Sequence, residues 1–203
     1  LLMLTASYTW SNPNPAFMMF GMIGGFILAI TTIFKKTWAP YTVSGYALLK
    51  GLALGGISRM FESQYPGIVG QAVFLTFGIL AALLFAYKSK LIKPTENFKL
   101  GIFAATGGIA ILYLISFVMS FFGGGLSILN PNNTSMFSIG ISLFIVVIAS
   151  LNLVLDFDFI EEGAEQGAPK YMEWYGAFGL LVTLIWLYLE ILRLLAKLQS
   201  RRS

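Results

Sequence analysis

Long apolar runs, each closed by a short polar segment, dominate the pattern of this chain. A helix that crosses a bilayer needs about 20 consecutive, mostly apolar residues. The runs that approach or reach this length are residues 16–34, 41–61, 68–87, 100–122, 136–159 and 170–198. Residues 1–10 are apolar but about half as long as a span, and we interpret them as the end of a first helix. The pattern therefore predicts an all-α, polytopic bundle of seven transmembrane segments, the first one truncated, in a single integral membrane domain over residues 1–203.

Glycines recur inside three of the predicted helices. Small residues allow helix backbones to approach closely in lipid, where no hydrophobic effect drives helices together. The glycines in question are Gly21, Gly24 and Gly25, then Gly51, Gly55 and Gly56, and finally Gly107 and Gly108. We expect these faces to be packing surfaces, either within the bundle or against a partner.

Composition agrees with a bilayer protein and excludes several chemistries. The 203 residues are 57% hydrophobic and 11% charged, whereas soluble domains carry about 25% charged residues. The chain has no cysteine and no histidine, which excludes Cys/His zinc sites, histidine-ligated haem and histidine-based catalytic triads. Nucleic-acid binding is also a poor interpretation, because the basic residues lie in segments that flank helices rather than on one soluble face.

Lysines and arginines are distributed unevenly between the polar segments. Segment 88–99 carries four lysines and segment 35–40 carries two, while segments 11–15, 62–67 and 123–135 carry none. The positive-inside rule places the lysine-bearing segments in the cytoplasm.

The basic C-terminal tail conflicts with this alternation. A seventh full span would put Lys197, Arg201 and Arg202 on the outer side. A last segment that re-enters the membrane, or kinks near Gly176 and Gly179, would keep the tail inside. The charge count favours a cytoplasmic tail.

Two carboxylates lie within apolar runs, Asp156 near the end of residues 136–159 and Glu190 deep in residues 170–198. Charged groups are costly in lipid, so an acid in such a run indicates function. Asn152 lies four residues before Asp156 and shares its helical face, whereas Asp158 points elsewhere. The side-chain oxygens of Asp156, Asn152 and Glu190 are of the type that calcium prefers as ligands. The alternative for Glu190 is a local ion pair with Arg193, three residues further on.

A short acidic stretch separates these two runs. Segment 160–169 contains Glu161, Glu162 and Glu165, close to Asp158. These carboxylates could form a vestibule that attracts cations, and the alternative is a solvated acidic turn.

Four stretches carry a family resemblance. They are LNLVLDFDFIE, the following GAPKYMEWYGAFGLLVTLIWLYLEILRLL, and the earlier YALLKGLALGGIS and YPGIVGQAV. With these motifs the chain resembles the Bax inhibitor family, also called the transmembrane Bax inhibitor motif proteins, and in particular its bacterial branch. The resemblance implies a bundle of seven membrane helices with the last helix central. It also implies a bacterial cytoplasmic (inner) membrane location.

The resemblance further implies a pH-sensitive calcium leak channel. In such proteins two carboxylates on the sixth and seventh helices share a proton and form the gate. These acids fall here on Asp156 and Glu190, the latter where many members have Asp. A basic latch at the end of the second helix falls on Lys35 or Lys36, where Arg is usual. No bound cofactor is implied; calcium is the permeant or transiently bound ion, with Asp156 and Glu190 as its ligands.

Two other function classes use the same features. An intramembrane aspartyl protease would also need two acids, but its Gly-x-Gly-Asp signature is absent and Asp156 lies in Val-Leu-Asp-Phe, so we expect no enzyme activity. The other class is a non-conducting regulator or accessory subunit. Such a subunit would bind a larger membrane complex, and an FtsH-type protease is the partner of some bacterial relatives.

Overall fold

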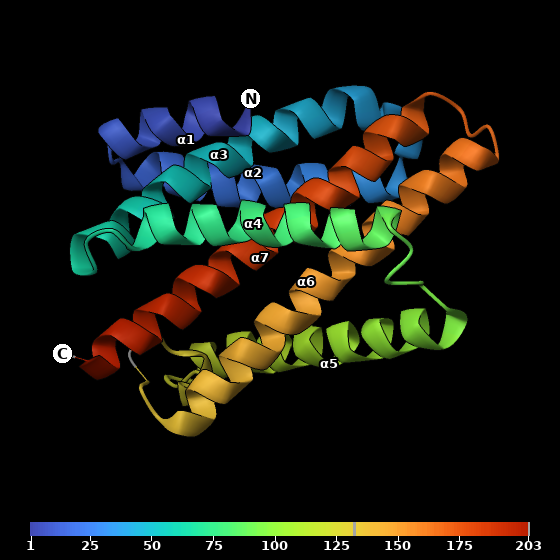
Figure 1. Cartoon of the computed structure of the whole chain (residues 1–203). Helices are drawn as coiled ribbons and strands as arrows, with labels where there is room; N and C mark the ends of the chain where they lie inside the picture. Colours follow the sequence, from blue (N-terminus) through green and yellow to red (C-terminus); the bar gives the residue numbers. More distant parts are fainter. Residues whose placement is uncertain (132, 203) are drawn as a thin grey trace. The chain divides into compact units, whose positions relative to one another are not determined.

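The computed structural model describes residues 1–131 and 133–202, and its secondary-structure elements in these residues are helices joined by turns and loops, without strands. Seven α-helices and two short 3-10 helices, η1 and η2, follow one another along the chain (Figure 1). Their bounds are α1 (Leu2–Ser11), α2 (Pro15–Phe34), η1 (Lys36–Trp38), α3 (Ala39–Gln64), α4 (Ile68–Lys88), α5 (Glu96–Phe121), η2 (Ser127–Leu129), α6 (Met136–Glu165) and α7 (Tyr171–Arg202). The predicted helical class and the order of its helices are confirmed.

Five of the described helices are long and apolar enough to cross a membrane, namely α2, α4, α5, α6 and α7. Only 11% of the apolar window is buried in α5 and 17% in α2 and α4, against 44% in both α6 and α7. Exposed apolar faces suit lipid, and among these five helices α6 and α7 are the most extensively buried. α3 has 26 residues but includes Lys50 and Arg59, which makes it less apolar.

Polar residues between the helices fix where the helices begin. Asn14 accepts a hydrogen bond from the Ala16 amide at 2.9 Å, and Pro15 takes the first position of α2. Thr95 caps α5 in the same way through the Phe98 amide. Such caps satisfy amide groups that have no partner within the helix. The polar segments that the sequence marks as boundaries therefore act as boundaries.

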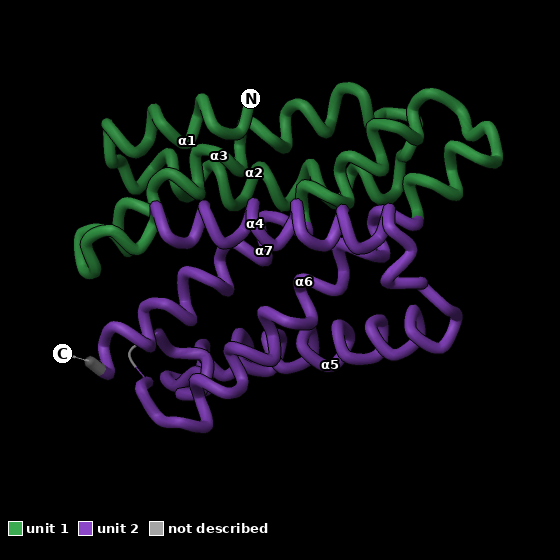
Figure 2. The backbone as a smooth tube through the Cα atoms, viewed as in Figure 1, with its two compact units in different colours: residues 1–69, 159–182 green, residues 70–158, 183–203 purple. Residues whose placement is uncertain are grey.

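The chain divides into two compact units, each described here by itself (Figure 2). Unit 1 comprises residues 1–69 and 159–182, which include α1, α2 and α3 with the end of α6 and the start of α7. Unit 2 comprises residues 70–158 and 183–203, which include α5 and the longer parts of α4, α6 and α7.

Glycines allow the backbones of the first three helices of unit 1 to approach one another closely. A side chain on Gly51 or Gly55 of α3 would collide with the backbone of α1 at Leu2 and Ala6. A side chain on Gly21 of α2 would likewise meet the backbone of α3. The packing faces predicted on the second and third helices are therefore confirmed, and they follow the close-approach logic of small residues in lipid.

On α5 the first alternative, packing within the bundle, is not observed in the described chain, and the second, a surface for a partner, stays a prediction. No other residue comes within 4 Å of the position that a side chain on Gly107 or Gly108 would take. These two glycines leave an open face on α5 instead of a packed one.

The last two helices differ from expectation at their ends. α6 continues to Glu165, so most of the predicted acidic loop is helical, because glutamate is a good helix former even where apolarity has ended. α7 is one continuous helix of 32 residues through Gly176 and Gly179. At about 1.5 Å per residue it is roughly 48 Å long, which is more than a full span, and a re-entrant segment is not what the structure shows.

Candidate functional site

The register between α6 and α7 in unit 2 determines which polar side chains meet. The Thr183 hydroxyl is hydrogen-bonded to the Asp156 carboxyl, and Lys197 Nζ lies 2.8 Å from Ser142 Oγ. The same number of residues separates Asp156 from Ser142 as separates Thr183 from Lys197, so the two helices run antiparallel in a constant register. Thr183, and not Glu190, is therefore the α7 residue that faces Asp156.

Glu190 lies two turns beyond Thr183, about 10 Å along the helix axis at 1.5 Å per residue. No hydrogen bond or ion pair joins Asp156 to Glu190, although both are described residues. The structure thus does not bring together the two carboxyls for which the sequence predicted a shared proton.

Glu190 is instead neutralised locally. Its side chain is 2% exposed, and Arg193 Nη1 lies 2.9 and 3.1 Å from its two carboxylate oxygens. The Tyr113 hydroxyl donates a hydrogen bond to Glu190 Oε1 and accepts one from Arg193 at 3.1 Å. A guanidinium one turn away offsets the lost hydration of a buried carboxylate, which a second carboxyl would not do. The alternative predicted for Glu190, the ion pair with Arg193, is the one observed.

Asp156 has an incomplete set of partners. Its Oδ2 atom is buried and accepts no hydrogen bond within the described part of the chain. Buried polar atoms almost always have a partner, and each exception needs an explanation. A carboxyl oxygen without a partner, inside a helix long enough to span the membrane, is a position where a proton or a cation could bind.

α5 presents a polar face to this region. Lys99, Thr106 and Tyr113 are spaced by seven residues, close to two helical turns, and so share one side of the helix. Lys99 Nζ lies 2.6 Å from Asp158 Oδ2, and Asn152 donates to Thr106 Oγ1 at 2.8 Å. Asp158 is thus tied to α5 by an ion pair, while Asn152 links α5 to the helix that carries Asp156.

Lys197 lies inside unit 2 and is fully buried. Its ammonium donates to the Ile128 carbonyl at 2.8 Å, to Ser138 Oγ at 2.7 Å and to Ser142 Oγ at 2.8 Å. The prediction that Lys197 is a charge of the basic tail is therefore wrong. Because Lys197 binds Ile128, the end of α7 lies beside the segment after α5, which carries no lysine or arginine. The positive-inside rule then places both on the outer side, contrary to the cytoplasmic tail favoured by the charge count.

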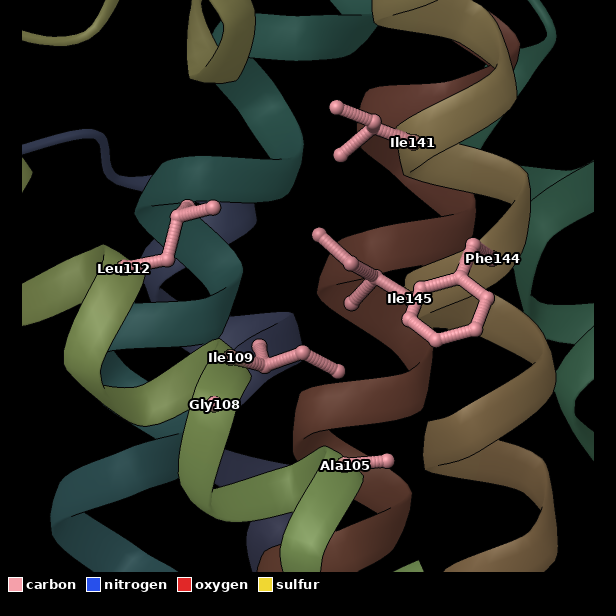
Figure 3. A pocket seen from close by; sticks show the side chains of 7 residues that line it. All are labelled: Ala105, Gly108, Ile109, Leu112, Ile141, Phe144 and Ile145. Atoms are coloured by element: carbon pink, nitrogen blue, oxygen red, sulfur yellow. The ribbon is translucent and has the colours of Figure 1, made fainter.

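An apolar pocket of about 370 Å³ opens between α5 and α6. Figure 3 shows side chains of both helices pointing into it. The residues that line it are Ala105, Gly108, Ile109, Leu112, Ile141, Phe144 and Ile145. None of these can bind an ion, so the pocket is separate in character from the polar groups described above.

The comparison with known families adds one decisive observation. A profile of the family described as Bax inhibitor 1 like matches residues 1–200. The chain belongs to this family. Neither a curated protein nor a solved structure gives a significant match. The family resemblance noted in the sequence is thereby confirmed over nearly the whole Bax inhibitor 1 like chain, which with its five apolar helices is an integral membrane protein.

The two candidate latch residues of this Bax inhibitor 1 like chain lie in unit 1. Lys35 Nζ lies 4.3 Å from the centre of the Trp38 ring, and Lys36 Nζ lies 5.1 Å from the centre of the Tyr175 ring. Both ammonium groups thus face aromatic rings. Their role as a latch stays a prediction.

The described residues contain no cluster of three or more acidic side chains that could hold a metal ion. Asn152 donates to Thr106 and to the Ile148 carbonyl, which leaves its amide oxygen one turn from Asp156. One carboxylate and one amide oxygen suit brief contact with a calcium ion that keeps most of its water. The predicted calcium site with both Asp156 and Glu190 as ligands is not formed in this structure, because the two carboxyl groups do not meet.

Several polar residues of this Bax inhibitor 1 like site were missed by the sequence analysis. They are Thr106 and Tyr113 on α5, Ser138 and Ser142 on α6, and Thr183 on α7. The seven-residue spacing from Lys99 to Tyr113 and the four-residue spacing from Ser138 to Ser142 are visible in the sequence and could have indicated shared faces. Thr183 has no such signal, because its importance depends on the register between two helices.

Proposed function

We propose that this Bax inhibitor 1 like protein is a pH-sensitive calcium leak channel of a bacterial cytoplasmic membrane, with Asp156 as its titrating group. The observation that carries the proposal is the buried Oδ2 atom of Asp156 without a hydrogen-bond partner. Glu190 is less suited to the role, because Arg193 and Tyr113 already bind its carboxylate.

The chemistry of Asp156 links proton binding to helix contact. Burial disfavours the charged form of a carboxyl group. In the protonated form the carboxyl is neutral and fits between α6 and α7 beside Thr183. In the charged form it attracts a divalent cation or draws water into the contact, which would loosen the two helices. The gate is then one carboxyl and one hydroxyl rather than two acids that share a proton.

A row of polar side chains in unit 2 would give an ion a route past this gate. Polar side chains follow one another from the Lys99–Asp158 ion pair through Asn152 and Glu190 to Lys197. Polar groups within membrane spans are costly and typically mark ion pathways. Because each of these groups is bound to a partner within the protein, we assign the structure to a closed state.

Reconstitution tests the proposal directly. Purified protein in liposomes, with a calcium-sensitive dye inside, should admit calcium at a rate that changes with pH, and empty liposomes should not. Replacement of Asp156 by Asn should abolish the change with pH. A reconstituted and folded protein that admits no calcium at any pH would contradict the proposal.

The second candidate is a non-conducting accessory subunit of a larger membrane complex, such as an FtsH-type protease. The observation that favours it is the open glycine face of α5, where no other described residue lies within 4 Å of the position that a side chain on Gly101, Gly107 or Gly108 would take. Such a face suits a helix of a partner protein. This candidate would be favoured if a partner protein co-purifies stoichiometrically in mild detergent and the purified protein shows no calcium leak. The substitutions Gly107→Ile and Gly108→Ile should then abolish the co-purification.

A further inference from the structure

The ammonium of Lys197 on α7 is held by an oxygen cage that two other segments form. The Ile128 carbonyl comes from η2, while the Ser138 and Ser142 hydroxyls come from successive turns of α6. The Ser138 carbonyl lies somewhat further away, at 3.3 Å. An ammonium has three hydrogens, and the three shorter contacts match them one to one. The cage therefore satisfies the cation completely.

Every oxygen of the cage is electrically neutral. Buried charges are normally paired with an opposite charge, yet no ion pair involves Lys197 among the described residues. The nearest carboxylate along α7 is Glu190, and its oxygens are bound by Arg193 and Tyr113. The direct contacts of the Lys197 ammonium are thus carbonyl and hydroxyl oxygens alone. Neutral carbonyl oxygens replace the hydration shell of potassium in selective channels.

We propose that this cage is a binding site for a small monovalent cation, either potassium or a primary ammonium. In the wild-type protein the ammonium of Lys197 occupies this site. The ammonium of Lys197 thereby excludes free cations from this part of unit 2, where Ile128 lies beside the end of α7. This inference concerns binding and is independent of whether the protein conducts calcium.

Thermal unfolding of the full-length protein in detergent tests the site without any flux measurement. Lys197→Ala removes the side chain and leaves the cage empty. In choline chloride this variant should unfold at a lower temperature than the wild type. Methylammonium or potassium chloride should restore part of the loss, as a saturable rise of about 4 °C, and the wild type should show no such rise. The two salts distinguish an ammonium site from a potassium site.

Two further variants separate cation binding from packing. Lys197→Met has nearly the same length without a charge, so it should be less stable than the wild type and should respond to neither salt. Ser142→Ala in the Lys197→Ala background removes one cage oxygen and should abolish the rise. The proposal is overturned if Lys197→Ala gains no cation-specific stability, which includes failure to fold in every salt. It is equally overturned if Lys197→Met is as stable as the wild type.

Discussion

The guanidinium of Arg193 lies 2.9 Å from the carboxylate of Glu190, one helical turn along α7. This ion pair neutralises the charge of Glu190 within its own helix. It leaves Asp156, which faces Thr183, as the acid whose charge is not matched by a neighbouring cation in the described residues. The two membrane acids of the chain therefore have different roles.

Removal of either charge from the Glu190–Arg193 pair should destabilise the protein strongly. A buried charge left without its partner costs about 3 kcal/mol, so Glu190→Gln and Arg193→Gln should each lower the free energy of unfolding by roughly that amount. The measurement is equilibrium unfolding in mixed micelles. The double variant should recover part of the loss, because it leaves no unpaired charge. Losses that simply add would argue against the pair.

The Tyr113 hydroxyl should contribute a smaller amount to the same cluster. Tyr113→Phe removes the donor to Glu190 and the acceptor for Arg193, and a buried hydrogen bond to a charged group is worth about 1.5–3 kcal/mol. We expect a loss within that range in the same unfolding assay. Tyr41→Phe is the matched control, because Tyr41 is 84% exposed and should change stability little. Equal effects of the two substitutions would count against the cluster.

Alanine in place of two glycines should change stability in opposite directions. Gly55→Ala places a methyl group against the backbone of α1 at Ala6 and should lower the unfolding temperature. Gly107→Ala meets no other residue, so it should gain up to about 1 kcal/mol from helix propensity. Thermal unfolding in one detergent compares them. A loss at both positions would show that the α5 face is packed after all.

The tail and the segment after α5 should lie on the same side of the membrane, because Lys197 binds the Ile128 carbonyl. The natural absence of cysteine permits single-cysteine labelling without further changes. Arg201→Cys and Gly124→Cys should react with a membrane-impermeant maleimide from the outer side. Lys93→Cys should react only after the membrane is opened. Labelling of Arg201→Cys together with Lys93→Cys would contradict this topology.

Much of the fold can be predicted from the sequence, because apolar run lengths and helix caps are local properties. Asn14 and Thr95 mark helix starts in both sequence and structure. The end of α6 was predicted too early, since Glu161 to Glu165 end the apolar run without ending the helix.

The site is harder to predict, because it depends on the register between helices. A shift of two turns decides whether Asp156 faces Thr183 or Glu190, and no pattern within α7 alone determines that shift. The Glu190–Arg193 pair was among the alternatives because it needs only the spacing within one helix. Lys197 was misplaced because its position near the end of the chain resembles that of a solvent-exposed tail residue.

The pH profile of calcium entry into liposomes tests the central claim, that Asp156 alone is the titrating gate. Asn mimics a protonated aspartate, so Asp156→Asn should admit calcium at one rate at every pH, equal to the wild-type rate at the acidic end of its profile. Glu190→Gln, normalised to the folded fraction, should retain the wild-type dependence on pH. The account is contradicted if Glu190→Gln abolishes the pH dependence while Asp156→Asn keeps it.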